Sequence, residues 1–216
     1  KQLLKFPMET QEVLKMAACI GNRFELETLA AITGASSNRT IDMLKDAIQK
    51  GLILSQADER FSFLHDRVQQ AAYSLIPEQS RSIVHLHIGR LMLNKTLPDQ
   101  LDEKIFNIVN QMNHGYNLID DMEERKRLAE LNLLAGKKAK ASTAYGSALN
   151  YLTIGTLLLP ADNWESFYEL SYDLFLNLAE CTFMNGDLDE AEGLLTMIIG
   201  KAKSKSHVAR ASYIKV

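Results

Sequence analysis

The chain has 216 residues, and its 24 Lys and Arg against 27 Asp and Glu give a formal net charge of −3. With 46% hydrophobic and 24% charged residues it has the composition of a soluble globular protein, which excludes wholesale disorder. No apolar run approaches the roughly 18 residues of a membrane span, no secretory leader is recognisable, and the slight acidity disfavours nucleic-acid binding by net charge.

The first 76 residues predict a winged-helix domain, because three helices are followed by a β-hairpin. Their expected order is helix 12–20, helix 25–32, helix 37–50, strand 52–54, turn 57–59 and strand 60–64. Gly21, Gly34 and Gly51 mark the ends of the helices, and Ser36 is a candidate N-cap for the third. The fold class is therefore mainly α with one small hairpin.

After residue 76 the sequence is typical of continuous helix. Residues 77–121 predict a helical linker bundle with helices over 79–94 and 101–114, and residues 122–216 predict tetratricopeptide-like helical hairpins. Small residues stand where two helices of a repeat would cross, namely Gly136, Ala148, Ala179, Gly186 and Ala191. Ala148 and Ala191 are 43 residues apart, more than the usual 34, so the repeats are irregular. A third hairpin begins near residue 206 and is cut off, as expected for a piece of a longer protein.

The two cysteines, Cys19 and Cys181, both lie in apolar helical patterns. We expect buried thiols, with neither a disulfide framework nor a zinc site, and this favours a reducing compartment, most simply the cytoplasm. His85 and His87 are two residues apart on a predicted helix and so point to different faces, which gives no metal constellation.

No catalytic motif is present: the sequence lacks a phosphate-binding loop, a G-x-S-x-G nucleophile elbow and an H-E-x-x-H motif. The helix over 37–50 mixes acids with bases, and the turn and flanks over 56–60 are net acidic. Since contacts to DNA phosphates need clustered Lys and Arg, a protein-facing winged helix is favoured over a DNA reader.

His65-Asp66-Arg67 is the most pointed polar cluster, placed where the second strand of the hairpin leads into a helix. One interpretation is helix capping, in which Asp66 complements the exposed N–H groups and the helix dipole. The other is that His65 faces a phosphate beside the helix N-terminus.

Residues 162–192 contain nine acids and no base, while residues 1–160 are almost balanced, with 19 basic and 18 acidic side chains. Aromatic residues recur there at helical spacing, at Trp164, Phe167, Tyr168, Tyr172 and Phe175. A parallel acidic row consists of Glu165, Glu169 and Asp173. One interpretation is that the aromatic residues pack in the core of a repeat and that the acidic residues lie on solvated helix faces. The other is a concave peptide-binding surface formed by Trp164, Tyr168, Tyr172 and the acidic row.

Four strings carry a family resemblance: Thr10–Phe24 (TQEVLKMAACIGNRF), His65–Pro77 (HDRVQQAAYSLIP), Ile88–Leu91 (IGRL) and Asn132–Tyr145 (NLLAGKKAKASTAY). Over nearly the whole chain they resemble the middle of large bacterial multidomain signalling proteins. In that family a serine/threonine-kinase-like domain and an AAA/STAND-type ATPase come first, and GAF and often sensor histidine kinase domains follow.

The resemblance implies a non-catalytic regulatory and scaffold segment that couples an upstream NTPase domain to a downstream output domain. The segment would hold no cofactor of its own, and ATP or ADP would belong to the upstream domain, whose bound phosphate His65 would touch. Its partners would be the domains of the same polypeptide or a protein or peptide ligand, with no nucleic acid and no membrane. The alternatives are an arm of a STAND-type transcriptional regulator and a peptide-binding tetratricopeptide-like module.

Overall fold

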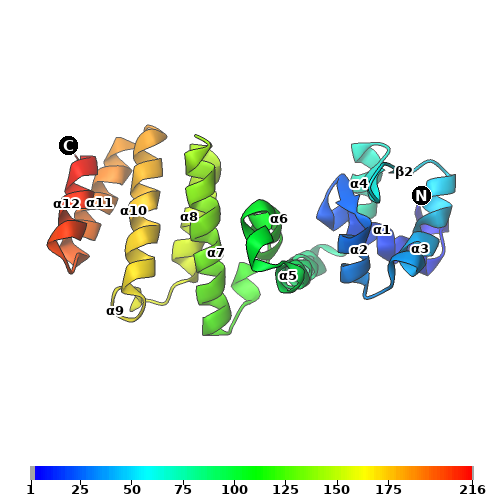
Figure 1. Cartoon of the computed structure of the whole chain (residues 1–216), viewed down its shortest axis with the longest axis horizontal. Helices are drawn as coiled ribbons and strands as arrows, with labels where there is room; N and C mark the ends of the chain where they lie inside the picture. Colours follow the sequence, from blue (N-terminus) through cyan, green and yellow to red (C-terminus); the bar gives the residue numbers. More distant parts are fainter. Residues whose placement is uncertain (1–2, 216) are drawn as a thin grey trace. The chain divides into compact units, whose positions relative to one another are not determined.

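A computed structural model describes residues 3–215 of the chain, which are mainly helical with one small sheet (Figure 1). The chain divides into two compact units. The first takes in the chain through Pro98 together with Asn110–Gly115, and the second consists of Asp99–Val109 and the chain from Tyr116 onward. The segment predicted as a separate linker bundle, 77–121, is thus divided between the two units. The helix that begins at Glu78 belongs to the first unit because it packs on the helix over Leu26–Thr33.

The first unit contains three N-terminal helices, a sheet and two further helices. Its elements are the 3-10 helix η1 (Leu3–Lys5), α1 (Met8–Ile20), β1 (Arg23–Glu25), α2 (Leu26–Thr33), α3 (Ser37–Gln49), β2 (Ile53–Ser55), β3 (Arg60–Phe63), α4 (Asp66–Tyr73) and α5 (Glu78–Lys95). The predicted helix ends are confirmed: Gly34 adopts the left-handed conformation at φ 67°, and the Ser36 hydroxyl accepts from the Arg39 N–H at 3.3 Å. The chain therefore turns where small or capping residues allow it.

The sheet has three antiparallel strands in the order β1-β3-β2, whereas the sequence predicted two. The missed strand β1 has three residues, of which Phe24 alone is apolar, so no alternating pattern announces it. Phe24 pairs with Phe61 across β3, and Ile53 of β2 pairs with Phe63. All four side chains are buried, and the Phe24 and Phe61 rings stack at 5.9 Å, so one face of the sheet closes the core of the first unit.

The second unit is built from helices that lie side by side with roughly aligned axes (Figure 1). Its helices are α7 (Met122–Ala141), α8 (Tyr145–Leu158), α9 (Asn163–Ser166), α10 (Tyr168–Met184), α11 (Leu188–Lys201) and α12 (Lys205–Lys215). The helix α6 (Leu101–Asn113) contributes residues to both units, and two 3-10 turns, η2 (Pro98–Gln100) and η3 (Tyr116–Leu118), flank it. Helix packs on helix in the order α7, α8, α10, α11 and α12, while α9 rests on α10.

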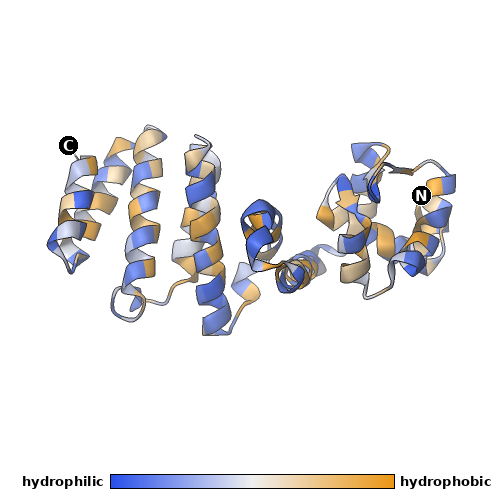
Figure 2. Cartoon of the chain, in the orientation of Figure 1, coloured by the Kyte–Doolittle hydropathy of each residue, from blue (hydrophilic) through white to orange (hydrophobic). Residues whose placement is uncertain are grey.

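The long helices contain both hydrophobic and hydrophilic residues (Figure 2), as expected when one side of a helix packs and the other meets water. Within residues 3–215, no helix combines the length and the apolar character needed to cross a lipid bilayer.

Close approach of neighbouring helices depends on glycine at two crossings of the second unit. A Cβ atom added to Gly136 of α7 would lie 2.6 Å from Leu152 Cγ of α8, and one added to Gly155 of α8 would lie 2.5 Å from Leu174 Cδ2 of α10. Real Cβ atoms do not approach carbon so closely, and both leucines are fully buried. Gly136 therefore lies at a helix crossing, as the sequence predicted, and allows α7 and α8 to approach closely.

We expect Gly136→Ala to lower the free energy of unfolding by about 1–3 kcal/mol, because the added methyl group overpacks the α7–α8 contact. Gly193→Ala is the matched control, since Gly193 lies inside α11 with open space where its Cβ would be. There the better helix propensity of alanine stabilises by up to about 1 kcal/mol. Chemical denaturation followed by circular dichroism measures both, and equal effects of the two variants would contradict the packing role of Gly136.

Candidate functional site

His65 stands at the junction between β3 and α4, where the sequence placed it. It is the N-cap residue of α4 with extended backbone (φ −145°, ψ 148°), and its side chain forms no capping hydrogen bond. His65, Asp66 and Arg67 are all exposed. Asp66 is the first residue of the helix and complements the dipole there, but the expected side-chain cap is not formed. The imidazole is therefore available to a partner outside the chain.

The aromatic residues at 164–175 are mostly used to build the second unit. Tyr172 is 1% exposed, and its ring lies 3.9 Å from the ring of His207 on α12. Its hydroxyl donates to the His207 carbonyl at 2.9 Å. Burial raises the pKa of the Tyr172 phenol, opposed by Arg210. Tyr172 is therefore buried in the core rather than displayed on the surface suggested for it.

Tyr168 and Trp164 lie at the edge of the same aromatic cluster as Tyr172 and His207. The Tyr168 hydroxyl accepts from the Lys203 backbone N–H at 2.7 Å and bonds His207 Nδ1 at 2.8 Å, while Trp164 stacks on Phe175 at 5.4 Å. Both Trp164 and Tyr168 are half-buried. The bonds of Tyr168 and Tyr172 hold α12 against α10. No sequence pattern indicates the position of His207, because it is 35 residues from Tyr172.

The acidic row is interrupted, since 164–175 is not one continuous helix. Phe167 separates α9 from α10 with non-helical backbone (φ −133°, ψ 47°). Glu165 and Glu169 are exposed, whereas Asp173 is half-buried and accepts from Lys137 Nζ at 2.6 Å. Two of the three acids thus face solvent, and the third is used within the unit.

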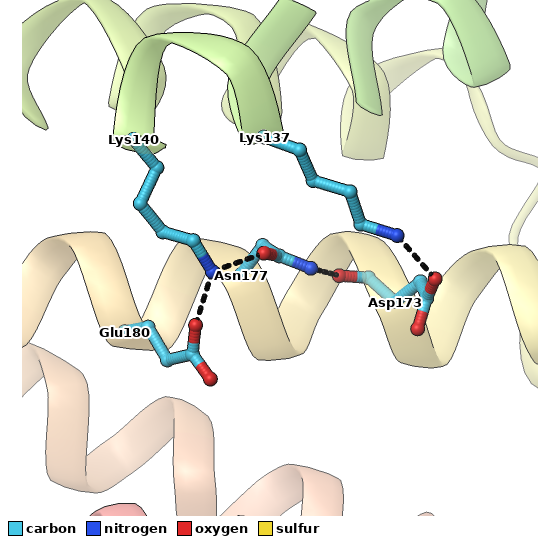
Figure 3. A network of polar contacts seen from close by, with 5 residues as sticks. All are labelled: Lys137, Lys140, Asp173, Asn177 and Glu180. Atoms are coloured by element: carbon cyan, nitrogen blue, oxygen red, sulfur yellow. Dashed lines mark hydrogen bonds and ion pairs between the residues drawn. The ribbon is translucent and has the colours of Figure 1, made fainter. Parts of the chain in front are cut away.

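A polar network joins α7 to α10 beside this pair (Figure 3). Lys140 Nζ donates to Asn177 Oδ1 at 2.5 Å and to a Glu180 carboxylate oxygen, and Asn177 Nδ2 donates to the Asp173 carbonyl at 2.7 Å. Figure 3 shows Lys137 and Lys140 both extending from α7 toward α10. Two lysines therefore balance two of the nine acids in 162–192, and partial exposure limits each pair to about 1 kcal/mol or less.

A second polar network is buried in the first unit and connects four helices. Tyr73 of α4 bonds His85 Nε2 of α5 at 3.0 Å, and His85 Nδ1 lies 2.7 Å from Gln111 Oε1 of α6. Gln111 Nε2 donates to the Cys19 carbonyl at the end of α1, at 2.8 Å. His85 and Gln111 are 4% and 7% exposed, whereas His87 is exposed. The prediction that the two histidines point to different faces is confirmed.

This network borders a hollow of about 450 Å³ in the surface of the first unit. It is lined by Ala18, Cys19, Gln69, Gln70, Tyr73, His85 and His114. Burial raises the pKa of the Cys19 thiol to about 12, opposed by Arg81, which favours the protonated thiol at neutral pH. Cys181 is also buried and free, which confirms the expectation of two buried thiols without a disulfide.

In the part of the chain covered by residues 3–215, no group of three or more His, Cys, Asp or Glu side chains is placed to hold a metal ion. Among the residues singled out from the sequence, His65, Glu165 and Glu169 are exposed.

Comparison with known proteins adds one relative. The chain is 26% identical to the hybrid signal transduction histidine kinase G of Dictyostelium discoideum, over an alignment of 277 residues that covers all of this chain and 8% of that protein. The chain thus spans less than a tenth of the length of this relative, which does not come from a bacterium. No protein-family model and no solved structure matches the chain.

We expect Tyr172→Ala to lower the free energy of unfolding by about 3–5 kcal/mol, because it empties a fully packed site and removes the bond to His207. Glu169→Ala on the exposed side of α10 should change it by less than about 0.5 kcal/mol. Thermal and urea denaturation measure both. If Tyr172→Ala left stability unchanged, its role in holding α12 would be refuted.

Proposed function

We propose that this chain is a non-catalytic regulatory and scaffold segment of a larger, cytoplasmic signalling protein. It couples the nucleotide state of an upstream NTPase domain to a downstream output domain through protein–protein contacts. The observation that carries the proposal is the similarity of the whole chain to a stretch making up only 8% of a hybrid histidine kinase. Because the aligned segment is a small part of that relative, we expect it to act together with neighbouring domains.

The two units suit different parts of this role. The order of α1, α2, α3 and the hairpin, with β1 added beside β3, supports a winged-helix domain in the first unit. The helical pairs α7–α8 and α10–α11, with Ala148 and Ala191 fully buried between helices, support tetratricopeptide-like hairpins in the second. The first unit would then contact the NTPase domain, and the second would extend toward the output domain.

The charges of α3 support a protein-facing winged helix. Arg39 pairs with Glu9 of α1 at 2.6 Å, and Lys50 Nζ lies 4.3 Å from the centre of the Phe6 ring. Two of the bases that a DNA reader would present are thus engaged inside the unit. Phosphate recognition is left to exposed His65, which would meet the phosphate of ATP or ADP held by the neighbouring domain.

Peptide binding by the second unit has weaker support. Of its proposed surface, Tyr172 lies in the core, Asp173 is paired with Lys137, and Glu165 and Glu169 are exposed. The arm of a transcriptional regulator would use the same contacts as a kinase-associated segment, and only its output domain would differ.

We expect His65→Ala in the full-length polypeptide to weaken retention of ATP or ADP by about tenfold, the loss of one hydrogen bond to a charged group. Equilibrium binding of a fluorescent nucleotide measures this, with His87→Ala on α5 as the control for losing an exposed histidine. Identical affinities for wild type and His65→Ala would remove His65 from the mechanism, and ATP turnover by the 216-residue chain alone would refute a non-catalytic role.

A further inference from the structure

The buried network Tyr73–His85–Gln111 has only one consistent arrangement of protons. Gln111 Nε2 donates to the Cys19 carbonyl, so Gln111 Oε1 is the atom that faces His85, and it can only accept. His85 Nδ1 must then carry the proton. The neutral ring presents the lone pair of Nε2 to the Tyr73 hydroxyl, which donates to it.

The network ends on the helix that the two units share. Gln111 lies in Asn110–Gly115, which belongs to the first unit, while the preceding part of α6 belongs to the second. At its other end is Tyr73, the last residue of α4, whose first turn follows His65. The eight-residue helix α4 thus runs from exposed His65 to Tyr73, which bonds the buried His85.

From these positions we propose that Tyr73, His85 and Gln111 form a proton-sensitive latch, which ties α4 to α6 while His85 is neutral and loosens when His85 binds a proton. The latch goes beyond the coupling role above, because it names the contact in the first unit that would open or close. It needs no nucleotide to operate.

The incoming proton has one place to go, His85 Nε2, and the hollow lined by Tyr73, His85 and His114 lets solvent approach that side of the ring. Once protonated, Nε2–H and the Tyr73 O–H would point at each other. The hydroxyl would rotate so that its oxygen accepts from Nε2–H, and the bond would reverse its direction. The latch would then be loosened by the positive charge itself, which this buried site does not compensate.

The surroundings oppose the positive charge on His85. The His114 ring stacks on it at 4.2 Å, and the Arg81 guanidinium lies 4.9 Å from the centre of the Tyr73 ring. The groups that face His85 from the packed elements are Cys19 on α1, Tyr73 on α4, Arg81 on α5, and Gln111 and His114 on and after α6. None of these is a carboxylate that would stabilise an imidazolium.

Burial lowers the pKa of His85, and His114 and Arg81 lower it further, while the hydrogen bond from Nδ1 to Gln111 acts in the opposite direction. A histidine with a lowered pKa in the folded state is stabilising above its unfolded value of about 6.5. That contribution is lost as the pH falls through 6.5 toward the folded-state pKa. The latch is therefore closed at neutral pH and opens on acidification.

The fold has a contact that survives the opening. Met112, beside Gln111, packs so closely on Gly89 of α5 that a Cβ at Gly89 would clash with the Met112 side chain. This apolar contact does not depend on the charge of His85, so α6 stays on α5 while its polar anchor is released.

The test uses the 216-residue chain without nucleotide, so its outcome is separate from that of the His65→Ala experiment. Long-range ¹⁵N–¹H NMR of the histidine rings gives the tautomer and titration midpoint of His85. Amide hydrogen exchange, corrected for intrinsic rates, reports the protection of residues 110–115 between pH 7.5 and 5.0. We expect the Nδ1–H tautomer, a midpoint below 6.5, and protection that falls along the same titration.

Tyr73→Phe removes a single hydroxyl and should reduce protection of residues 110–115 about threefold to tenfold at pH 7.5, the loss of one hydrogen bond. It should also shift the titration midpoint of His85, because Nε2 loses a hydroxyl that can donate to the neutral ring and accept from the protonated one. His87→Gln, at an exposed position on the same helix, should change neither. An Nε2–H tautomer, a midpoint at or above 6.5, or protection indifferent to the His85 titration would each overturn the latch, and all three are measured on the wild-type chain.

Discussion

Two helices can lie close together only where one of them presents almost no side chain, and the second unit depends on this constraint at successive crossings. Gly136 of α7 receives Leu152 of α8, and α8 in turn offers Gly155 to Leu174 of α10. Each leucine fills the space that the opposite glycine leaves open, so α7, α8 and α10 are held in one register. A side chain at either glycine would force two helices apart. The order of helices in the unit therefore follows from a few small residues.

Ion pairs stabilise the second unit less than this packing of glycine against leucine does. The stretch 162–192 contains nine acids and no base, and Lys137 and Lys140 approach it from α7. Their pairs with Asp173 and Glu180 are partly exposed, so water screens much of the attraction. The pairs therefore add little stability, and their main effect is on the orientation of α10 against α7. Glu165 and Glu169 are exposed and add negative charge to the surface of the second unit.

Local features could be predicted from the sequence because local chemistry decides them. Gly21, Gly34 and Gly51 end helices, Ser36 caps one, and the boundaries of α7 fall at 122 and 141 as the pattern predicted. The strand β1 escaped because three residues are too few to show a period. The break at Phe167 was not predicted, because phenylalanine is no helix breaker and the aromatic residues on both sides of it recur at helical spacing.

Contacts between residues far apart in the chain could not be predicted from the sequence, for a different reason. His85 meets Gln111 across 26 residues, and Gln111 meets the Cys19 carbonyl across 92. A backbone carbonyl has no signature in the sequence at all. The candidate site was predicted in part: His65 stands where expected, while Tyr172 joined the core because His207, 35 residues away, covers it.

The size of the buried network suits a coupling role. A signal between two sites is transmitted only through groups whose energy differs between two states, and such coupling typically amounts to about 1–3 kcal/mol. Tyr73, His85 and Gln111 contribute two side-chain hydrogen bonds, each worth roughly 1 kcal/mol, which falls in that range. The surrounding core of Leu14, Leu26, Leu29 and Leu44 is worth far more and would not yield to a contact at His65. A contact that pulled on α4 would therefore act on the Tyr73–His85 bond, which links that helix to Gln111 of α6 through His85.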